Sequence, residues 1–185
     1  MLNFNNKLVL ALLLVVFACL WRVLGVYNFS PIAATALFSG ALFGRKAMAF
    51  ILPLVVLFVS DLLVNTFVYQ MPNPFAYFFK WEALSVYPTY IVITLIGGWV
   101  GLKGKYARVP MGAITSSALF FVVTNTAAWA SDSMYTKNIA GLIESYTLAL
   151  PFVQNTFWGD MVFAIFFFGS YYLAQNLAPA KQKIQ

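Results

Sequence analysis

The 185-residue sequence contains no histidine, a single cysteine and only five acidic residues. The absence of histidine excludes Ser-His-Asp triads, HExxH zinc sites and bis-histidine haem ligation. The single cysteine, Cys19, excludes an intrachain disulfide and a CxxC motif. No GxxxxGK[ST] phosphate-binding loop occurs either. The sequence therefore predicts no enzyme centre and no cofactor, and any dependence on ATP would have to come from a partner protein.

Apolar residues dominate what is present. Hydrophobic residues make up 62% of the chain and charged residues 9%, whereas a soluble domain carries about 25% charged residues. Since one membrane span takes about 20 apolar residues, we expect an all-α, polytopic helical bundle that forms a single integral membrane domain over residues 1–185. The expected spans cover residues 8–26, 31–44, 47–68, 86–102, 110–130 and 151–174.

The basic residues predict the orientation of these six spans. Eight of them fall on one side: Lys7, Arg45, Lys46, Lys103, Lys105, Arg108, Lys181 and Lys183. The loops of the other side hold only Lys80 and Lys137. Because lysine and arginine accumulate in cytoplasmic loops, we expect both termini in the cytoplasm. The net charge of +6 then reflects topology and contact with anionic lipids rather than binding to nucleic acid.

Two of the expected outer loops are longer than the inner turns. Residues 69–82 are rich in aromatic side chains, which form either an interfacial belt or a lid over an outward-facing cavity. Residues 139–146 place apolar side chains at helical spacing, which predicts a short amphipathic helix on the outer surface. Thr136 or Asn138 is the expected cap of that helix.

Three ionisable residues lie within the expected spans: Arg22, Asp61 and Asp160. Each costs about 2.5–3.5 kcal/mol on insertion scales, and all three fall in the outer half of the bilayer. The amides of Asn65, Asn125 and Asn155 lie at a similar depth, and Asn28 precedes the second span.

This clustering predicts a polar, partly hydrated cavity that opens to the outside between spans one, three, five and six. Arg22 would neutralise one aspartate, which leaves the other to a ligand, a proton or the amide network. The alternative is a buried structural network that only fixes the packing of the helices.

Small residues form a stripe along the second span. Ala36, Gly40 and Gly44 recur at every fourth position, a spacing that lets another helix approach closely. The stripe indicates either internal packing or a docking surface for a partner membrane subunit.

Several motifs carry a resemblance to a known family. They are Asn28-Phe-Ser-Pro-Ile-Ala-Ala-Thr-Ala-Leu-Phe-Ser-Gly40, Ser60-Asp61, Val123-Thr-Asn125 with Trp129, and Asn155-Thr with Gly159-Asp160. Together they resemble a family of small uncharacterised bacterial inner-membrane proteins. That family is similar, more loosely, to the six-helix substrate-binding (S) components of energy-coupling-factor vitamin transporters.

The S-component resemblance implies a vitamin-like ligand near the outer face, held by the polar residues above together with Trp129. It also implies location in the bacterial cytoplasmic membrane and, as partners, a membrane coupling subunit with ATPases. S components typically dock through an Ala-x-x-x-Ala pattern in span one, whereas span one here offers Ala11 and Ala18.

The leading hypothesis is therefore a protein that binds or transports a small micronutrient. The alternative is a scaffold subunit of the cell envelope, of the rod-shape-determining type, that acts through protein partners. A remote alternative is an intramembrane aspartyl protease that uses Asp61 and Asp160. However, the Gly-x-Gly-Asp signature is replaced here by Phe157-Trp-Gly-Asp160.

Overall fold

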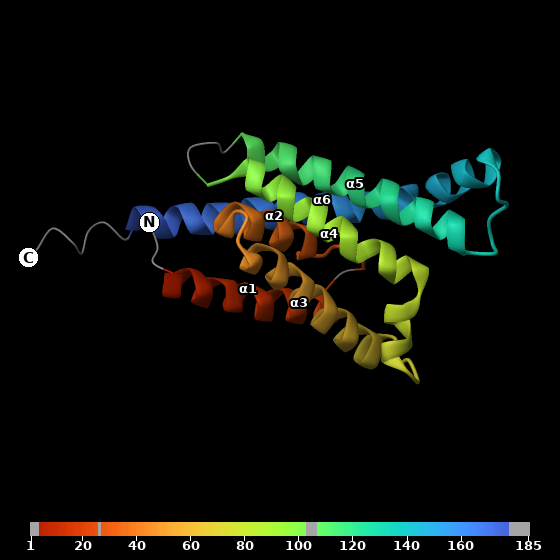
Figure 1. The fold of residues 1–185 in the computed structure, drawn as a ribbon, viewed down its shortest axis with the longest axis horizontal. Coiled ribbons are helices and arrows are strands. Elements are labelled where there is room, and N and C mark those ends of the chain that lie inside the picture. Colours follow the sequence, from red (N-terminus) through yellow and green to blue (C-terminus); the bar gives the residue numbers. More distant parts are fainter. Residues whose placement is uncertain (1–3, 26, 103–106, 178–185) are drawn as a thin grey trace, which may run out of the picture.

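A computed structural model describes residues 4–25, 27–102 and 107–177, and these residues form helices and their connections (Figure 1). The α-helices are α1 (Phe4–Leu24), α2 (Ile32–Phe43), α3 (Ala47–Leu63), α4 (Trp81–Val100), α5 (Arg108–Ser131) and α6 (Ile139–Leu177). A π-helical turn, η1 (Val64–Val68), extends α3, and a 3-10 helix, η2 (Pro74–Phe79), precedes α4. The all-α prediction is confirmed for the described residues.

The helices have the length and composition of a membrane protein. Four helical stretches within the described residues are long and apolar enough to cross a bilayer, namely Ala47–Val68, Ala83–Val100, Arg108–Ser131 and Ile139–Gln175. Two shorter apolar helices, Leu12–Leu24 and Ile32–Phe43, accompany them. Large apolar side chains such as Leu13, Leu20 and Ile165 point away from the bundle. A surface of this kind fits a lipid environment better than water.

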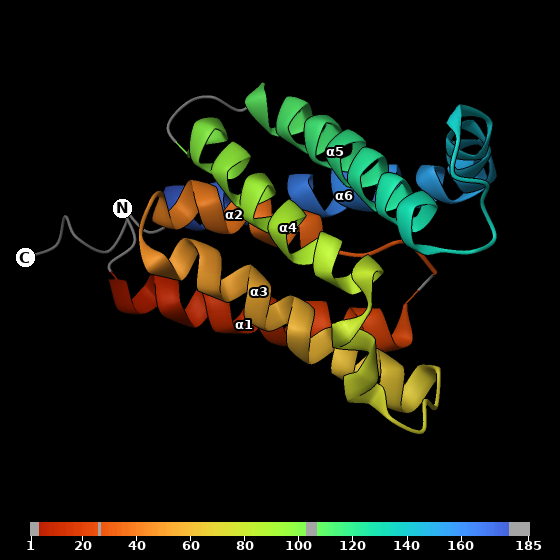
Figure 2. The ribbon, with the colours of Figure 1, turned by 45° about the vertical axis from the view of Figure 1, so that its right-hand side comes forward.

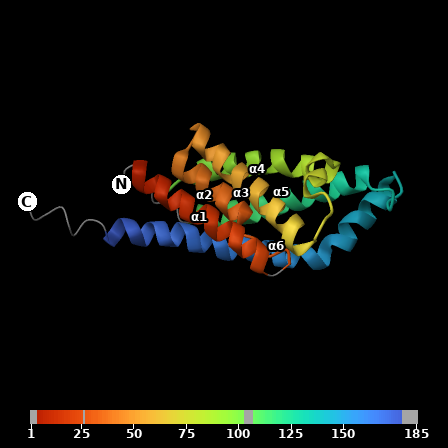
Figure 3. The same cartoon turned by 90° about the horizontal axis from the view of Figure 1, so that it is seen from below.

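Helix α2 lies inside the bundle, with α3, α4 and α6 packed around it (Figures 1 and 3). Nearly all of its side chains are buried, as expected for a helix that is apolar all round. Its two hydroxyl side chains are satisfied internally. Thr35 Oγ1 donates to the carbonyl of Pro31 at 2.8 Å, and Ser39 Oγ donates to the carbonyl of Ala49 at 2.9 Å. A short helix of 12 residues can therefore form the centre of the fold.

Gly40, in the middle of the small-residue stripe of α2, packs against α4. A Cβ atom on Gly40 would overlap the carbonyl oxygen of Thr94, and one on Gly97 would overlap that of Leu37. Ala36 is fully buried. Of the stripe, only Gly44 is exposed, where it ends α2 with a φ of 65°. Ala36 and Gly40 therefore contribute to internal packing rather than to an exposed docking surface.

This close approach predicts a cost for added volume. We expect Gly40→Ala to destabilise the protein by about 1–3 kcal/mol because the two backbones must separate. Gly169→Ala is the matched control, since a Cβ at Gly169 meets nothing within 4 Å. Thermal unfolding in detergent should show a lower midpoint for Gly40→Ala and little change for Gly169→Ala. Equal midpoints would contradict the packing.

The expected surface helix at residues 139–146 is part of α6. Contrary to the prediction of a separate helix before residue 151, α6 runs from Ile139 to Leu177 with Pro151 inside it. The ribbon of α6 turns within its first third (Figure 2), consistent with the bend that an internal proline imposes. The predicted cap is confirmed, because Asn138 Oδ1 accepts hydrogen bonds from the Gly141 N–H at 2.9 Å and from Thr136 Oγ1 at 3.0 Å.

The ends of the helices sort into two groups. The beginning of α1, the α2–α3 turn, the beginning of α5 and the end of α6 lie at one end of the bundle (Figure 1). The η2 segment and the connection between α5 and α6 lie at the opposite end. Of the basic residues used to predict orientation, Lys103, Lys105, Lys181 and Lys183 lie outside the described residues.

Candidate functional site

A partly buried ion pair joins α1 to α3. Arg22, in the last turn of α1, places its Nη1 atom 2.5 Å from Asp61 Oδ1 and 2.7 Å from Ser60 Oγ. The side chains of Arg22 and Asp61 are 22% and 6% exposed. This arrangement agrees with the predicted neutralisation of one aspartate by Arg22, and it adds Ser60 as a second partner of the guanidinium.

The second aspartate has a different kind of partner. Asp160, near the middle of α6, is 3% exposed, and its Oδ2 accepts a hydrogen bond from Ser117 Oγ of α5 at 2.5 Å. No lysine or arginine of the described residues forms an ion pair with it. The negative charge of an ionised Asp160 would therefore have a neutral hydroxyl, not a cation, as its partner.

A cavity of about 140 Å³ brings the three charged residues together. Every α-helix contributes to its wall, as do η2 and the α1–α2 connection. The lining residues are Arg22, Asn28, Ser30, Ile32, Ala33, Leu57, Asp61, Tyr77, Val86, Tyr90, Phe120, Thr156 and Asp160. We call this space the charged cavity. More helices line it than predicted, because α2, α4 and η2 contribute in addition to α1, α3, α5 and α6.

A second cavity, of about 220 Å³, adjoins the first. The two share Asn28, Phe120 and Thr156 as wall residues. Asn125 of α5 lines the second cavity, with its side-chain Nδ2 donating to the carbonyl of Phe121 at 2.8 Å. The predicted residue Asn28 therefore lines both cavities, whereas Asn125 lines the second cavity and Asp160 the first.

The α1–α2 connection is held against the wall by hydrogen bonds. Asn28 has a φ of 59°, a left-handed conformation that asparagine adopts more readily than most residues. Trp21 Nε1 donates to the carbonyl of Phe29 at 2.8 Å, and Asn155 Nδ2 donates to the carbonyl of Tyr27 at 3.2 Å. The predicted site residue Asn155 is exposed and does not itself line either of the two cavities. It positions the segment that carries Asn28.

Two buried polar atoms near the ion pair have no hydrogen-bond partner among the described residues, namely Asn65 Nδ2 and Tyr87 Oη. Asn65 lies in the π-helical turn one turn beyond Asp61 and is 4% exposed. It does not line either of the two cavities. Single π-helical turns occur often at functional sites, and buried polar atoms without partners are rare in native proteins.

Trp129 lies away from the charged residues. Near the end of α5, its Nε1 donates to the carbonyl of Thr136 at 2.9 Å, and its own carbonyl accepts a hydrogen bond from Lys137 Nζ. Lys137 Nζ also donates to the carbonyl of Asp132. Trp129 therefore orders the connection between α5 and α6, and it lines neither of the two cavities.

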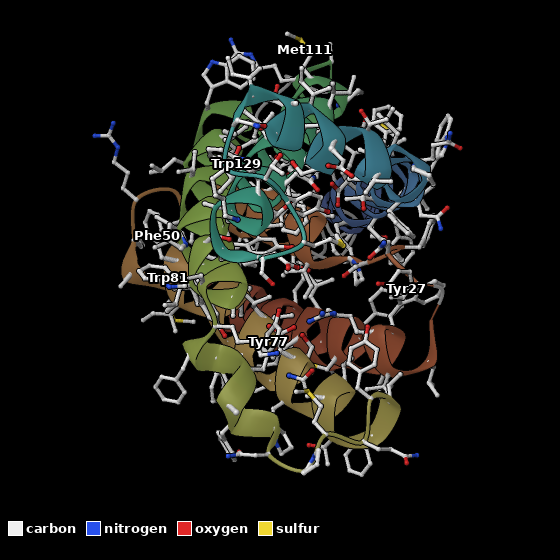
Figure 4. All side chains as sticks on the ribbon, turned by 90° about the vertical axis from the view of Figure 1, so that its right-hand side faces the viewer. Tyr27, Phe50, Tyr77, Trp81, Met111 and Trp129 are labelled. Atoms are coloured by element: carbon white, nitrogen blue, oxygen red, sulfur yellow. The ribbon has the colours of Figure 1, made fainter. Side chains whose placement is uncertain are left out.

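Aromatic side chains complete the charged cavity, and two of them, Tyr90 and Phe120, were not predicted from the sequence. Tyr90 of α4 is buried, with its ring 5.8 Å from that of Phe120. Tyr77 belongs to the aromatic loop segment considered as either a belt or a lid. It lines the cavity, while its neighbours Phe75 and Phe79 are exposed. In Figure 4, Tyr77 lies nearer the middle of the bundle than Tyr27 or Trp81.

Fold and site together define a helical, membrane-type bundle with a charged cavity enclosed by its helices. Residues 2–181 match a family described as a family of unknown function (DUF6580), and the chain belongs to that family. No curated protein and no solved structure matches the chain.

Proposed function

We propose that the protein spans the bacterial cytoplasmic membrane six times, with both termini in the cytoplasm. In this proposal it binds or transports a small, micronutrient-like molecule through an outward-facing polar cavity. The observation that carries the proposal is the charged cavity itself. Arg22, Asp61 and Asp160 come from three different helices and line one space.

The partner of Asp160 supports a ligand more than a purely structural network. A structural network is expected to satisfy each buried charge with an opposite charge, as Arg22 does for Asp61. Asp160 instead receives one hydrogen bond from Ser117 and faces a space large enough for a molecule. Apolar pockets with a few convergent polar groups are typical ligand sites.

The proposed orientation is supported by the arrangement of the helix ends. The turn with Arg45 and Lys46 lies at the end of the bundle where α1 begins and α6 ends (Figure 1). Arg22 and Asp61 lie in the last turns of their helices, toward the opposite end. With the basic end in the cytoplasm, the charged cavity lies on the outer side.

The hydrogen bonds favour binding over proteolysis. The dyad of an aspartyl protease shares one proton between two carboxylates in direct contact. Here Asp61 is bonded to Arg22 and Asp160 to Ser117, so each carboxylate has its own partner. This difference is the reason for preferring a binding protein to an enzyme.

A coupling subunit with ATPases remains part of the proposal through the S-component resemblance. Ala36 and Gly40 are buried, and Gly40 lies against α4, so such a subunit would contact the exposed apolar faces of other helices. Helix α1 offers one such face, which includes Leu13, Val16 and Leu20.

Analysis of the small molecules that co-purify with the protein tests the proposal. We expect wild-type protein in mild detergent to release one small molecule on denaturation, detected by mass spectrometry. We expect Asp160→Asn to retain much less of it, because the carboxylate at the cavity wall is lost. Glu144→Gln is the matched control, since Glu144 lies exposed on the same helix. Equal amounts from the two variants, or none from the wild type, would contradict the proposal.

A further inference from the structure

We infer that the ligand of the charged cavity is a small organic cation, an ammonium group on a body about the size of one ring. This inference rests on the proposed binding function and names the chemical class of the ligand. Three features of the cavity wall carry it: the balance of charge, the aromatic side chains and the volume.

The charge of the wall does not balance. Arg22 and Asp61 neutralise one another at 2.5 Å, which leaves Asp160 as an additional acid in the same lining. Burying an ionised carboxylate without a counter-charge costs several kcal/mol. A ligand with one positive charge would remove that cost, whereas an anionic ligand would increase it.

The hydrogen bonds of Asp160 leave room for such a ligand. A carboxylate offers about four acceptor positions, and the hydroxyl of Ser117 occupies one of them, at Oδ2. An ammonium group brings up to three donors and no acceptor. It therefore complements a wall on which a carboxylate still has acceptor capacity.

Aromatic rings line the same space. Tyr77, Tyr90 and Phe120 all belong to the wall, and the last two lie ring against ring at 5.8 Å. Aromatic faces attract ammonium groups, most strongly where water is excluded. Tyr90 is buried, so its surroundings meet that condition.

The volume limits the size of the ligand. A cavity of about 150 Å³ accommodates a benzene molecule, and the charged cavity measures about 140 Å³. The second cavity, of about 220 Å³, shares Asn28, Phe120 and Thr156 with it as wall residues. A body of about one ring is therefore the largest that the charged cavity accepts beside Asp160.

A series of probes that differ only in charge tests the inference. Benzylammonium, benzyl alcohol and benzoate share one ring, and their affinities are measured by calorimetry with titrations into empty micelles subtracted. We expect wild-type protein to bind benzylammonium at least about tenfold more tightly than benzyl alcohol, as a charged hydrogen bond allows. Benzoate should bind most weakly. In Asp160→Asn the preference for the cation should disappear.

The wild-type series decides the inference even if Asp160→Asn does not fold. Equal affinities for benzylammonium and benzyl alcohol would indicate that Asp160 is protonated and therefore uncharged. That result would overturn the inference. Tighter binding of benzoate, or no binding of any probe, would overturn it as well. If the purified protein nevertheless retains a neutral or anionic molecule, the proposed binding function stands without the cation.

Discussion

Replacing Arg22 by leucine should destabilise the protein by about 3–5 kcal/mol, the usual cost of removing one partner from a buried ion pair. The cost arises from Asp61, which stays nearly buried after Arg22 is replaced. Asp61 is only 6% exposed and would keep Ser60 nearby but lose its cation. The effect should be large because an ionised carboxylate that is largely removed from bulk water is costly to leave without its cation.

A double variant separates the ion pair from the general packing of α1. Because a buried ion pair can be replaced by apolar side chains with little loss of stability, Arg22→Leu combined with Asp61→Leu should recover most of the lost stability. The free energies of unfolding of the wild type, the single variants and the double variant, measured in detergent, form a double-mutant cycle.

Arg108→Leu is the control for this cycle. Arg108 donates to the carbonyl of Trp99 at 3.1 Å and lies over its ring at 4.9 Å, and it has no acidic partner among the described residues. Its replacement should cost less than half as much as that of Arg22. A cost for Arg22→Leu no larger than that for Arg108→Leu would contradict the buried pair, as would a double variant less stable than Arg22→Leu.

Filling the cavity at Thr156 should abolish binding of the co-purified molecule. Thr156 lines both cavities, so an indole at this position would occupy the space between them. We expect Thr156→Trp to weaken binding by at least about a hundredfold, since ligand sites depend on an open, preformed space.

Thr147→Trp is the matched control for the filled cavity. Thr147 and Thr156 lie on the same helix, and each hydroxyl donates to the carbonyl four residues earlier. Thr147 is exposed and lines neither of the two cavities. Retention of the molecule is compared in the two variants by mass spectrometry. Unchanged retention in Thr156→Trp would place the ligand elsewhere.

The helices and the charged pair could be predicted from the sequence because both follow from strong local signals. Long apolar segments must be helical in a membrane, and the six expected spans overlap α1 to α6. An arginine and an aspartate at similar depth on apolar helices have strong reason to meet, and Arg22 and Asp61 do.

The rest of the wall depends on which helix faces which, and hydropathy carries no such information. Tyr90, Phe120 and Ser117 look like ordinary residues of apolar helices, and only the packing of α4 and α5 brings them to Asp160. Trp129 illustrates the opposite case. The resemblance to S components implied a ligand contact for Trp129, but its N–H donates to the carbonyl of Thr136 in the connection between α5 and α6.

An experimental structure of the protein, purified in mild detergent together with its bound molecule, tests the central claim most directly. We expect a non-protein molecule in the charged cavity, in contact with Asp160 and with at least one of Tyr77, Tyr90 and Phe120. A charged cavity that contains only ordered water, with the retained molecule bound elsewhere, would contradict it.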